Sequence, residues 1–247
     1  SLFHGAPLLA IKAASKMVDM VFFGSPETEL EKISAKASLN SFIWVPWEEI
    51  EEYIKKSDAV LIGPGFMRFH SEKTEDHKRI IECDEVCQQT TKITKRLLLK
   101  FPEKKWVIDG GSLQVLDPTW IPKGAVLTPN RKEFEMLFGK LSVEDMAQKY
   151  HCVICDKGSV AYVSDGETTY EITGGNAGLT KGGTGDTLAG MTVGLLAKND
   201  PVLSAAAASF VVKKTAECLF EKVGYSFNAD DVADEVFTTL RRLTVNN

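Results

Sequence analysis

Residues 174–190 read Gly-Gly-Asn-Ala-Gly-Leu-Thr-Lys-Gly-Gly-Thr-Gly-Asp-Thr-Leu-Ala-Gly. Seven of the chain's 19 glycines fall within these 17 positions, and this density indicates a feature shaped by the backbone. Glycine adopts positive φ angles and lets another molecule approach the main chain closely. Downstream, the apolar residues Leu188, Leu195 and Leu196 recur at helical spacing. The sequence therefore predicts a helix over 186–198 that begins directly after the glycines.

The turn Gly182-Gly183-Thr184-Gly185 would stand at the N-terminus of that helix. The first N–H groups of a helix lack intrahelical partners, and the helix dipole adds partial positive charge at this end. Such an end is suited to a phosphate group. The stretch matches neither the GxxxxGK[ST] nor the GxGxxG pattern, so we predict an anion site from helix geometry and not from these motifs.

Asp186 follows the turn directly, and two interpretations are open. In one, the carboxylate only interacts favourably with the helix dipole, by about 0.3–1 kcal/mol. In the other, it is a general base that takes a proton from the hydroxyl accepting a phosphoryl group.

Short apolar runs alternate with amphipathic stretches along most of the chain. We expect strands at 20–23, 42–45, 59–62, 106–109, 125–127 and 152–155. Apolar residues on both faces of these runs are typical of buried parallel strands. Asp165-Gly166 predicts a hairpin turn between two further strands. The pattern predicts the α/β class, with a mostly parallel central sheet, helices on both faces and a single domain over 1–247.

Composition narrows the classes of partner. Asp and Glu outnumber Lys and Arg, 34 to 29, and the net charge of −5 argues against nucleic acid. No apolar run reaches the roughly 18 residues of a membrane span, so no membrane partner is expected. The five cysteines are odd in number and scattered, which favours the cytoplasm. Cys152 and Cys155 have the spacing of a metal or redox pair, but they fall in an expected buried strand.

From Asn176 to Gly190 the sequence resembles the signature of the ADP/ATP-dependent NAD(P)H-hydrate dehydratases, which belong to the ribokinase-like superfamily. The resemblance extends along nearly the whole chain. Its further segments are Gly5-Ala6-Pro7-Leu8-Leu9-Ala10, Gly63-Pro64-Gly65, Val107-Ile108-Asp109 with Leu113, Leu127-Thr128-Pro129 with Glu133-Phe134, and Lys157-Gly158.

The resemblance implies a three-layer α/β/α domain and a lyase that repairs the 6-hydroxy adducts of NADH and NADPH (NADHX and NADPHX). Hydroxide leaves poorly, so members of the family phosphorylate the hydroxyl from ADP or ATP, with Mg²⁺, and then eliminate phosphate. The family also implies a homo-oligomer, often a tetramer.

The resemblance assigns roles to single positions, with Asp186 as the catalytic base. The substrate-binding positions are Ala6, Gly65, Asn130 and Asp186. The nucleotide-binding positions are Lys157, Gly158, Ser159, Val160, Ala161 and Gly185, and the anion hole comprises Gly182, Gly183, Thr184 and Gly185. A second group consists of Asp109, Asn176 and Glu133, of which Glu133 would order Mg²⁺ through water.

Structural alternatives stand beside several of these roles. Ala6 and Gly65 would also suit tight helix and strand ends, and Lys157 could be an exposed charge. Asp109 could line a site at a strand end or cap the next short helix.

The chain departs from the family pattern in three places. Asn130 stands where dehydratases usually carry His, and Ala161 where they usually carry Thr. The strand that usually precedes the Gly5-Ala6 helix has no counterpart except Ser1, so we expect an open edge at the substrate pocket.

Asn130-x-x-Glu133 resembles a motif of ribokinase-type kinases. It supports an alternative function, a small-molecule kinase for hydroxymethylpyrimidine, pyridoxal or a sugar. A non-catalytic nucleotide-binding protein is a third hypothesis.

Overall fold

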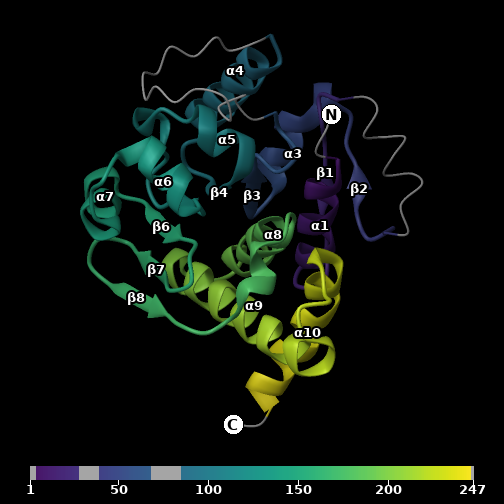
Figure 1. Cartoon of the computed structure of the whole chain (residues 1–247). Helices are drawn as coiled ribbons and strands as arrows, with labels where there is room; N and C mark the ends of the chain where they lie inside the picture. The colour runs from purple at the N-terminus through teal and green to yellow at the C-terminus, as the bar shows by residue number, and fades with distance from the viewer. Residues whose placement is uncertain (1–3, 28–38, 68–84, 246–247) are drawn as a thin grey trace.

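The computed structural model describes residues 4–27, 39–67 and 85–245 (Figure 1). Its main sheet has six strands, adjacent in the order β3 (Ala59–Ile62), β4 (Lys105–Ile108), β5 (Val126–Leu127), β6 (Val153–Asp156), β7 (Ala161–Ser164) and β8 (Thr169–Ile172). Strands β3 to β6 run parallel, whereas β7 and β8 form an antiparallel hairpin beside β6. The predicted α/β class and the hairpin are confirmed.

The two expected strands nearest the N-terminus do not join this sheet. β1 (Phe22–Phe23) and β2 (Ile43–Trp44) pair with each other in a separate two-stranded parallel sheet. The ring of Phe23 packs edge-on against the rings of Phe42 and Trp44. Ile43 is 43% exposed, so these strands lack the burial on both faces that the apolar pattern predicted.

Helices cover both faces of the main sheet (Figure 1). One side carries α1 (Gly5–Ala14), α8 (Thr184–Leu196), α9 (Pro201–Val223) and α10 (Ala229–Val245). The other side carries α3 (Ile50–Lys56), α4 (Glu85–Lys100), α5 (Gly110–Val115), α6 (Arg131–Phe138) and α7 (Val143–Tyr150). Short 3₁₀ turns lie at η1 (Trp47–Glu49), η3 (Pro118–Trp120) and η4 (Ala177–Thr180).

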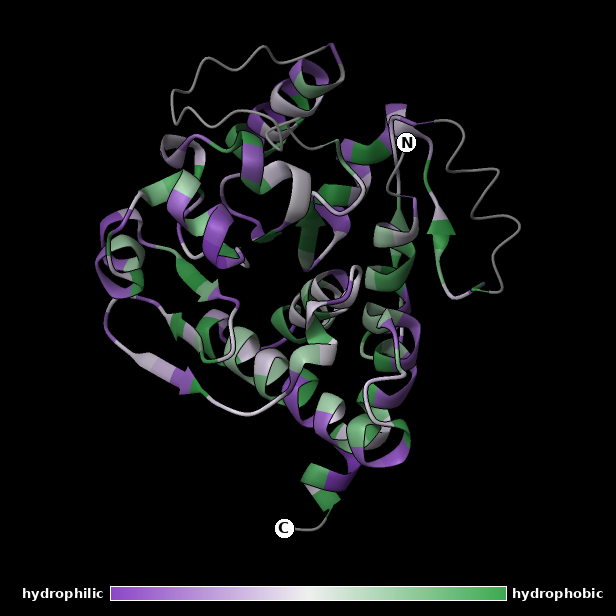
Figure 2. Cartoon of the chain, in the orientation of Figure 1, coloured by the Kyte–Doolittle hydropathy of each residue, from purple (hydrophilic) through white to green (hydrophobic). Residues whose placement is uncertain are grey.

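The core is divided in two by the alternation of side chains along the strands. Val107 and Val126 belong to the cluster on the α8 and α9 side. Their neighbours Ile108 and Leu127 belong to the cluster on the α4 to α7 side. Because successive residues of a strand point to opposite faces, four-residue apolar strands supply both clusters. Figure 2 shows β6 in the hydrophobic colour, whereas the edge strand β8 is more polar.

Helix α8 packs close to α1 because two residues of α8 at the contact are glycines and carry no side chain. A Cβ atom on Gly190 would lie 2.2 Å from the carbonyl oxygen of Ala10, and one on Gly194 would lie 3.1 Å from the Cβ of Met17. The two helix backbones therefore approach to a distance that only glycine permits at position 190. This contact fixes where the N-terminus of α8 lies.

Every helix in the described part of the chain is too short or too polar to cross a lipid bilayer.

We predict that Gly190→Ala lowers the free energy of unfolding by about 1–3 kcal/mol, because the new methyl group must push backbone atoms of α1 away. Chemical denaturation monitored by circular dichroism measures this change. The matched control is Gly5→Ala, since a Cβ there meets no atom within 4 Å. Equal stability of the Gly190→Ala variant and the parent protein would contradict the close contact between α1 and α8.

Candidate functional site

Polar residues and tight turns gather where the parallel strands end. The turn Gly63-Pro64-Gly65 follows β3, Asp109 follows β4, and Lys157 follows β6. The main-chain pairing continues past the strands, since the N–H of Asp109 bonds to the carbonyl oxygen of Ile62 at 3.1 Å. Ligands of parallel α/β sheets bind outside the carboxyl ends of the strands. This edge of the sheet is therefore the candidate site.

Lys157 and Asp109 form a largely buried ion pair at this edge. The Nζ of Lys157 lies 2.9 Å from Oδ1 of Asp109, and the two side chains are 20% and 4% exposed. The hydroxyl of Thr128 donates to the same oxygen at 2.9 Å. The Asp109 side chain does not cap α5, so the helix-capping interpretation is wrong. Lys157 is likewise not the exposed charge of the structural alternative.

Two carboxylates determine the protonation of Lys157. Burial alone would lower the pKa of Lys157, but the charges of Asp109 and Glu133, with the hydrogen bond to Asp109, outweigh it and raise the pKa. Lys157 is therefore a fixed cation at neutral pH.

The N-terminus of α8 meets this cation. A Cβ atom on Gly185 would lie 3.3 Å from the Nζ of Lys157. The N-cap residue, Gly183, has a φ of 95° and no side chain to cap the helix. A Cβ on Gly183 would lie 2.5 Å from Leu9 and 2.8 Å from Ala229. The positive end of the helix dipole and an ammonium group thus lie close together, and this arrangement suits an anion with several oxygens.

Asp186 occupies the third position of α8, which begins at Thr184 and not at Asp186. The side-chain hydroxyl of Thr184 donates to the carbonyl oxygens of Leu179 and Lys181, at 2.7 and 2.9 Å, and so joins the turn to the helix. Asp186 is 7% exposed. A carboxylate buried at a helix N-terminus, three residues after the glycine cap, can accept a proton from a group bound there.

Asn130 and Glu133 bind each other at the start of α6. The Oδ1 of Asn130 accepts from the N–H of Glu133 at 3.0 Å, and Oε2 of Glu133 accepts from the N–H of Asn130 at 2.9 Å. This reciprocal pair is a capping box. The Asn130-x-x-Glu133 spacing that resembles a kinase motif is therefore also explained by helix capping.

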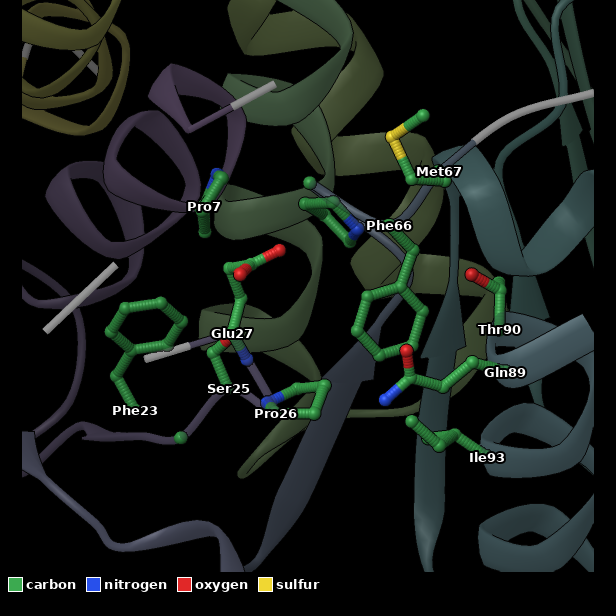
Figure 3. Close-up of a pocket in the computed structure, with 13 residues that line it drawn as sticks. Pro7, Phe23, Ser25, Pro26, Glu27, Phe66, Met67, Gln89, Thr90 and Ile93 are labelled. Atoms are coloured by element: carbon green, nitrogen blue, oxygen red, sulfur yellow. The ribbon is translucent and has the colours of Figure 1, made fainter. Parts of the chain in front are cut away.

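A pocket of about 120 Å³ opens beside Gly65 (Figure 3). Pro7 of α1, Glu27 after β1, Phe66 after β3 and Gln89 of α4 line it, so it is built from four separate parts of the chain. Two of the predicted substrate positions are related to it. Gly65 lines the pocket, and Ala6 precedes the lining residue Pro7 in the first turn of α1.

A second hollow, of about 760 Å³, borders the loop between β6 and β7. Four of the predicted nucleotide positions, residues 157–160, line it. Ala161 does not, because its side chain is 2% exposed within β7. Arg131 also lines the hollow, and its guanidinium donates to Asp156 at 3.1 Å.

Asn176 and Lys181 stabilise the glycine-rich segment. Asn176 caps η4 by accepting from the N–H of Gly178 at 2.9 Å and donates to the carbonyl oxygen of Ala216 at 2.7 Å. The ammonium of Lys181 donates to the carbonyl oxygens of Tyr225 and Phe227. Among the sites predicted from the sequence, Lys157, Gly185 and Asp109 come together, whereas these two side chains turn to the surrounding backbone.

Thr128 was missed in the sequence as a member of the site, although the signal was present. It stands in the Leu-Thr-Pro segment directly after β5, where a hydroxyl at a strand end faces the neighbouring strand ends.

The Cys152 and Cys155 pair is not a metal or redox centre. Both thiols are buried in or next to β6, and burial raises the pKa of each to about 12. A thiol with so high a pKa is a poor nucleophile at neutral pH, and the described residues contain no group of three His, Cys, Asp or Glu that could hold a metal ion.

The sequence model of a family described as NAD(P)H-hydrate dehydratase matches residues 1–237. The chain is 31% identical over 246 residues to a bifunctional NAD(P)H-hydrate repair enzyme of Archaeoglobus fulgidus, with 95% of this chain and 48% of the relative covered. It is 27% identical to an ADP-dependent (S)-NAD(P)H-hydrate dehydratase of Nitrosopumilus maritimus, with 97% and 85% covered. The chain thus spans about half the length of the bifunctional relatives it matches.

The fold is similar to that of an ADP/ATP-dependent NAD(P)H-hydrate dehydratase of Bacillus subtilis that was co-crystallised with ATP and Mg²⁺. The TM-score is 0.72 at 22% identity, over 97% of this chain and 85% of that chain. The likeness shows the fold, a three-layer α/β/α arrangement with a mostly parallel central sheet.

We predict that Lys157 and Asp109 are energetically coupled. Lys157→Met leaves two buried carboxylates without their cation and lowers the free energy of unfolding by about 3 kcal/mol. The double variant with Asp109→Asn loses less than the sum of the two single losses, by about 1–3 kcal/mol. Denaturation of the four proteins gives the coupling.

The exposed pair Lys198 and Asp58, 2.7 Å apart, is the matched control and shows no measurable coupling in the same cycle. Additive losses at Lys157 and Asp109 would show that their ion pair does not stabilise the site.

Proposed function

Because the chain belongs to the NAD(P)H-hydrate dehydratase family, we propose that it dehydrates the 6-hydroxy forms of NADH and NADPH with ADP or ATP as phosphoryl donor. The observation that carries this proposal is the N-terminus of α8, where buried Asp186 and the nearby Lys157 flank Gly185. An anion-binding helix end with a carboxylate beside it fits phosphoryl transfer to a hydroxyl group.

The chemistry solves the problem of a poor leaving group. The terminal phosphoryl group of the nucleotide moves to the hydroxyl oxygen of the hydrate, and that hydroxyl gives up its proton. The carbon–oxygen bond then breaks, and phosphate leaves with the electron pair, assisted by the lone pair of the ring nitrogen. Loss of a proton from the neighbouring ring carbon completes the removal of water and restores NADH or NADPH.

Asp186 takes the proton of the hydroxyl in this proposal. Its carboxylate stands at the helix end that receives the phosphoryl group, so one base and one acceptor are held at the same place. General-base assistance of this kind contributes about 10²–10⁴-fold to the rate.

Lys157 and the amides of the α8 turn stabilise the charge on the phosphoryl group. Gly182, Gly183, Thr184 and Gly185 form the anion hole, and residues 157–160 of the loop before β7 bind the rest of the nucleotide. The ion pair with Asp109 holds the Lys157 ammonium in position before the nucleotide arrives. Donors fixed in advance need no reorganisation when charge develops.

The hydrate binds beside Gly65, in the pocket next to the first turn of α1. Ala6 belongs to that turn, and Asn130 lies at the same edge of the sheet. Because the Asn130 side chain already accepts from Glu133, its amide N–H groups are what it offers to the substrate.

Mg²⁺ fits the site as an ion carried by the nucleotide. The described residues contain no cluster of three acidic, His or Cys side chains that could hold a metal alone. Mg²⁺ keeps several waters and is bound by phosphates with one or two carboxylates, so such a cluster is not required. Glu133 is the residue proposed to order the Mg²⁺ ion. It would do so through water and not by direct coordination, because its Oε2 already accepts from the N–H of Asn130. The ion would neutralise phosphate charge.

Residues 1–247 are proposed to form one domain that acts as a homo-oligomer, a tetramer among the forms expected, with small molecules as its partners. The net charge of −5 supports the absence of a nucleic-acid partner. Cys152, Cys155 and Cys218 are free thiols, whereas Cys87 is disulfide-bonded, which counts against the cysteine argument for the cytoplasm. The cytoplasmic location stays a prediction.

The activity is tested by incubating the protein with hydrated NADH and either ADP or ATP. Return of reduced nicotinamide with release of phosphate, and of AMP from ADP, supports the dehydratase. Transfer of phosphate to hydroxymethylpyrimidine, pyridoxal or a sugar, with a stable phosphorylated product, supports the kinase alternative. Binding of nucleotide without turnover of any substrate supports the non-catalytic alternative.

We predict that Asp186→Asn lowers the turnover of hydrated NADH by about 10²–10⁴-fold, because the amide cannot accept the proton. Nucleotide binding, measured by calorimetry, is retained in this variant.

Asp145→Asn is the matched control. Asp145 also stands at the third position of a helix, α7, but it is exposed and lies outside the site. Unchanged turnover in the Asp186→Asn variant would contradict the proposed general base. Asp186 would then interact only with the helix dipole.

A further inference from the structure

Lys213, in the middle of α9, is a buried lysine whose partners are all backbone carbonyls. Lys213 is 5% exposed. The Nζ donates to the carbonyl oxygens of Gly158, Ser159 and Gly174, at 2.9, 2.6 and 3.1 Å. A lysine ammonium has three N–H donors, so all of them are used.

These three carbonyls belong to two separate loops. Gly158 and Ser159 lie in the loop between β6 and β7, directly after Lys157. Gly174 opens the glycine-rich segment between β8 and α8. The proposed function assigns the nucleotide to the first loop, and the second segment leads to the α8 turn to which it assigns the phosphoryl group. Lys213 joins the two from the side of α9.

Glu217, one helical turn further along α9, binds the same peptide group from its other end. Its Oε1 accepts from the N–H of Gly175 at 2.8 Å, while Lys213 donates to the carbonyl oxygen of Gly174. The carbonyl of Gly174 and the N–H of Gly175 form one peptide unit. Cation on oxygen and anion on N–H match the dipole of that unit, and a flipped peptide would meet the wrong charge at both ends.

The backbone at this point can adopt its conformation only with glycine. Gly174 and Gly175 have φ angles of 88° and 76°. A Cβ on Gly174 would lie 2.4 Å from Oε1 of Glu217, and one on Gly175 would lie 3.1 Å from Cγ of Lys213. Two successive glycines would otherwise be free to change conformation. The charged pair on α9 removes that freedom.

The burial of Lys213 has an energetic cost that the carbonyls offset. Burial lowers the pKa of Lys213, and the neighbouring Cys155 and Glu217 oppose this only in part. A charge in such a place persists when its hydrogen bonds are complete. Its three acceptors therefore hold Lys213, and Lys213 holds the two loops.

We infer that Lys213 is a positioning residue for the nucleotide: it fixes the Gly158–Ser159 loop, which lines the hollow assigned to a nucleoside di- or triphosphate, against the Gly174–Gly175 turn. This inference rests on the proposed function. Lys213 bonds to these loops and not to the α8 turn or Asp186, so it affects nucleotide affinity more than the chemical step.

The test is Lys213→Met, which keeps the length of the side chain and removes the ammonium. The KM for ADP or ATP is expected to rise about tenfold or more, because the variant removes all three hydrogen bonds that fix the loop. The turnover number and the KM for hydrated NADH are expected to stay within about twofold of the parent protein, because the groups of the transition state are untouched. Lys222→Met, on the same helix and 46% exposed at its side chain, is the control.

Direct binding of ADP and ATP by calorimetry separates this inference from the proposed function. If the parent protein binds neither nucleotide, both the proposed function and the inference are wrong. If the parent protein binds nucleotide but does not turn over hydrated NADH, only the dehydratase assignment is wrong, and tenfold weaker binding by Lys213→Met still supports the inference.

An equal affinity of the parent and Lys213→Met proteins for nucleotide overturns the inference. A lower melting temperature with unchanged KM does so as well, since it assigns Lys213 to stability alone. Where Lys213→Met does not fold, Lys213→Gln, which keeps two N–H donors without a buried charge, takes its place. An intermediate rise of the nucleotide KM supports the inference, and an unchanged KM overturns it.

Discussion

The ion pair between Lys157 and Asp109 joins the sheet edge to the end of helix α8. Its 2.9 Å contact links residues that are 48 positions apart, and the same ammonium stands beside Gly185. A cation next to the positive end of a helix is unfavourable unless anions compensate for it. Asp109 and Glu133 supply that negative charge within the protein, and a bound phosphate would supply more. In the proposed function, the phosphate would interact with the same ammonium that Asp109 and Glu133 hold at the sheet edge.

The glycines of residues 174–190 serve several different ends. Gly190 lets α8 approach α1, Gly183 provides a cap without a side chain, and Gly174 with Gly175 forms a turn held by charges on α9. Each glycine contact determines a different property of the α8 N-terminus. These properties are its distance from α1, its accessibility and the path of the chain that leads to it. A glycine-rich string is therefore as much a packing device as a ligand site.

The sequence predicted those features that depend on local pattern. The strands of the main sheet, the hairpin at Asp165-Gly166 and the helix after the glycines all follow from periodicity and turn chemistry, because these act over a few residues. The separate pairing of β1 with β2 and the role of Lys213 could not be predicted. Lys213 looks like a solvated lysine in an amphipathic helix, and its acceptors are carbonyls 39 to 55 residues away. Asp109 was ambiguous because a carboxylate after a strand can cap a helix or face a neighbouring strand, and only the fold decides.

Asn130 and Glu133 show why a motif must be tested against local structure before it supports a function. Their reciprocal bonds satisfy two N–H groups at the start of α6, so helix capping alone accounts for both residue types at this spacing. The pair cannot then discriminate between a kinase and a dehydratase, since either enzyme would need α6 to begin at this place. The distinction moves to what happens after phosphoryl transfer. A kinase must release the phosphorylated product, whereas a dehydratase must retain it until phosphate leaves, and the adduct of a reduced nicotinamide contains the ring nitrogen that makes this departure possible. The roles proposed for the residues at the α8 end would serve either reaction, so the identity of the substrate is what would distinguish the two.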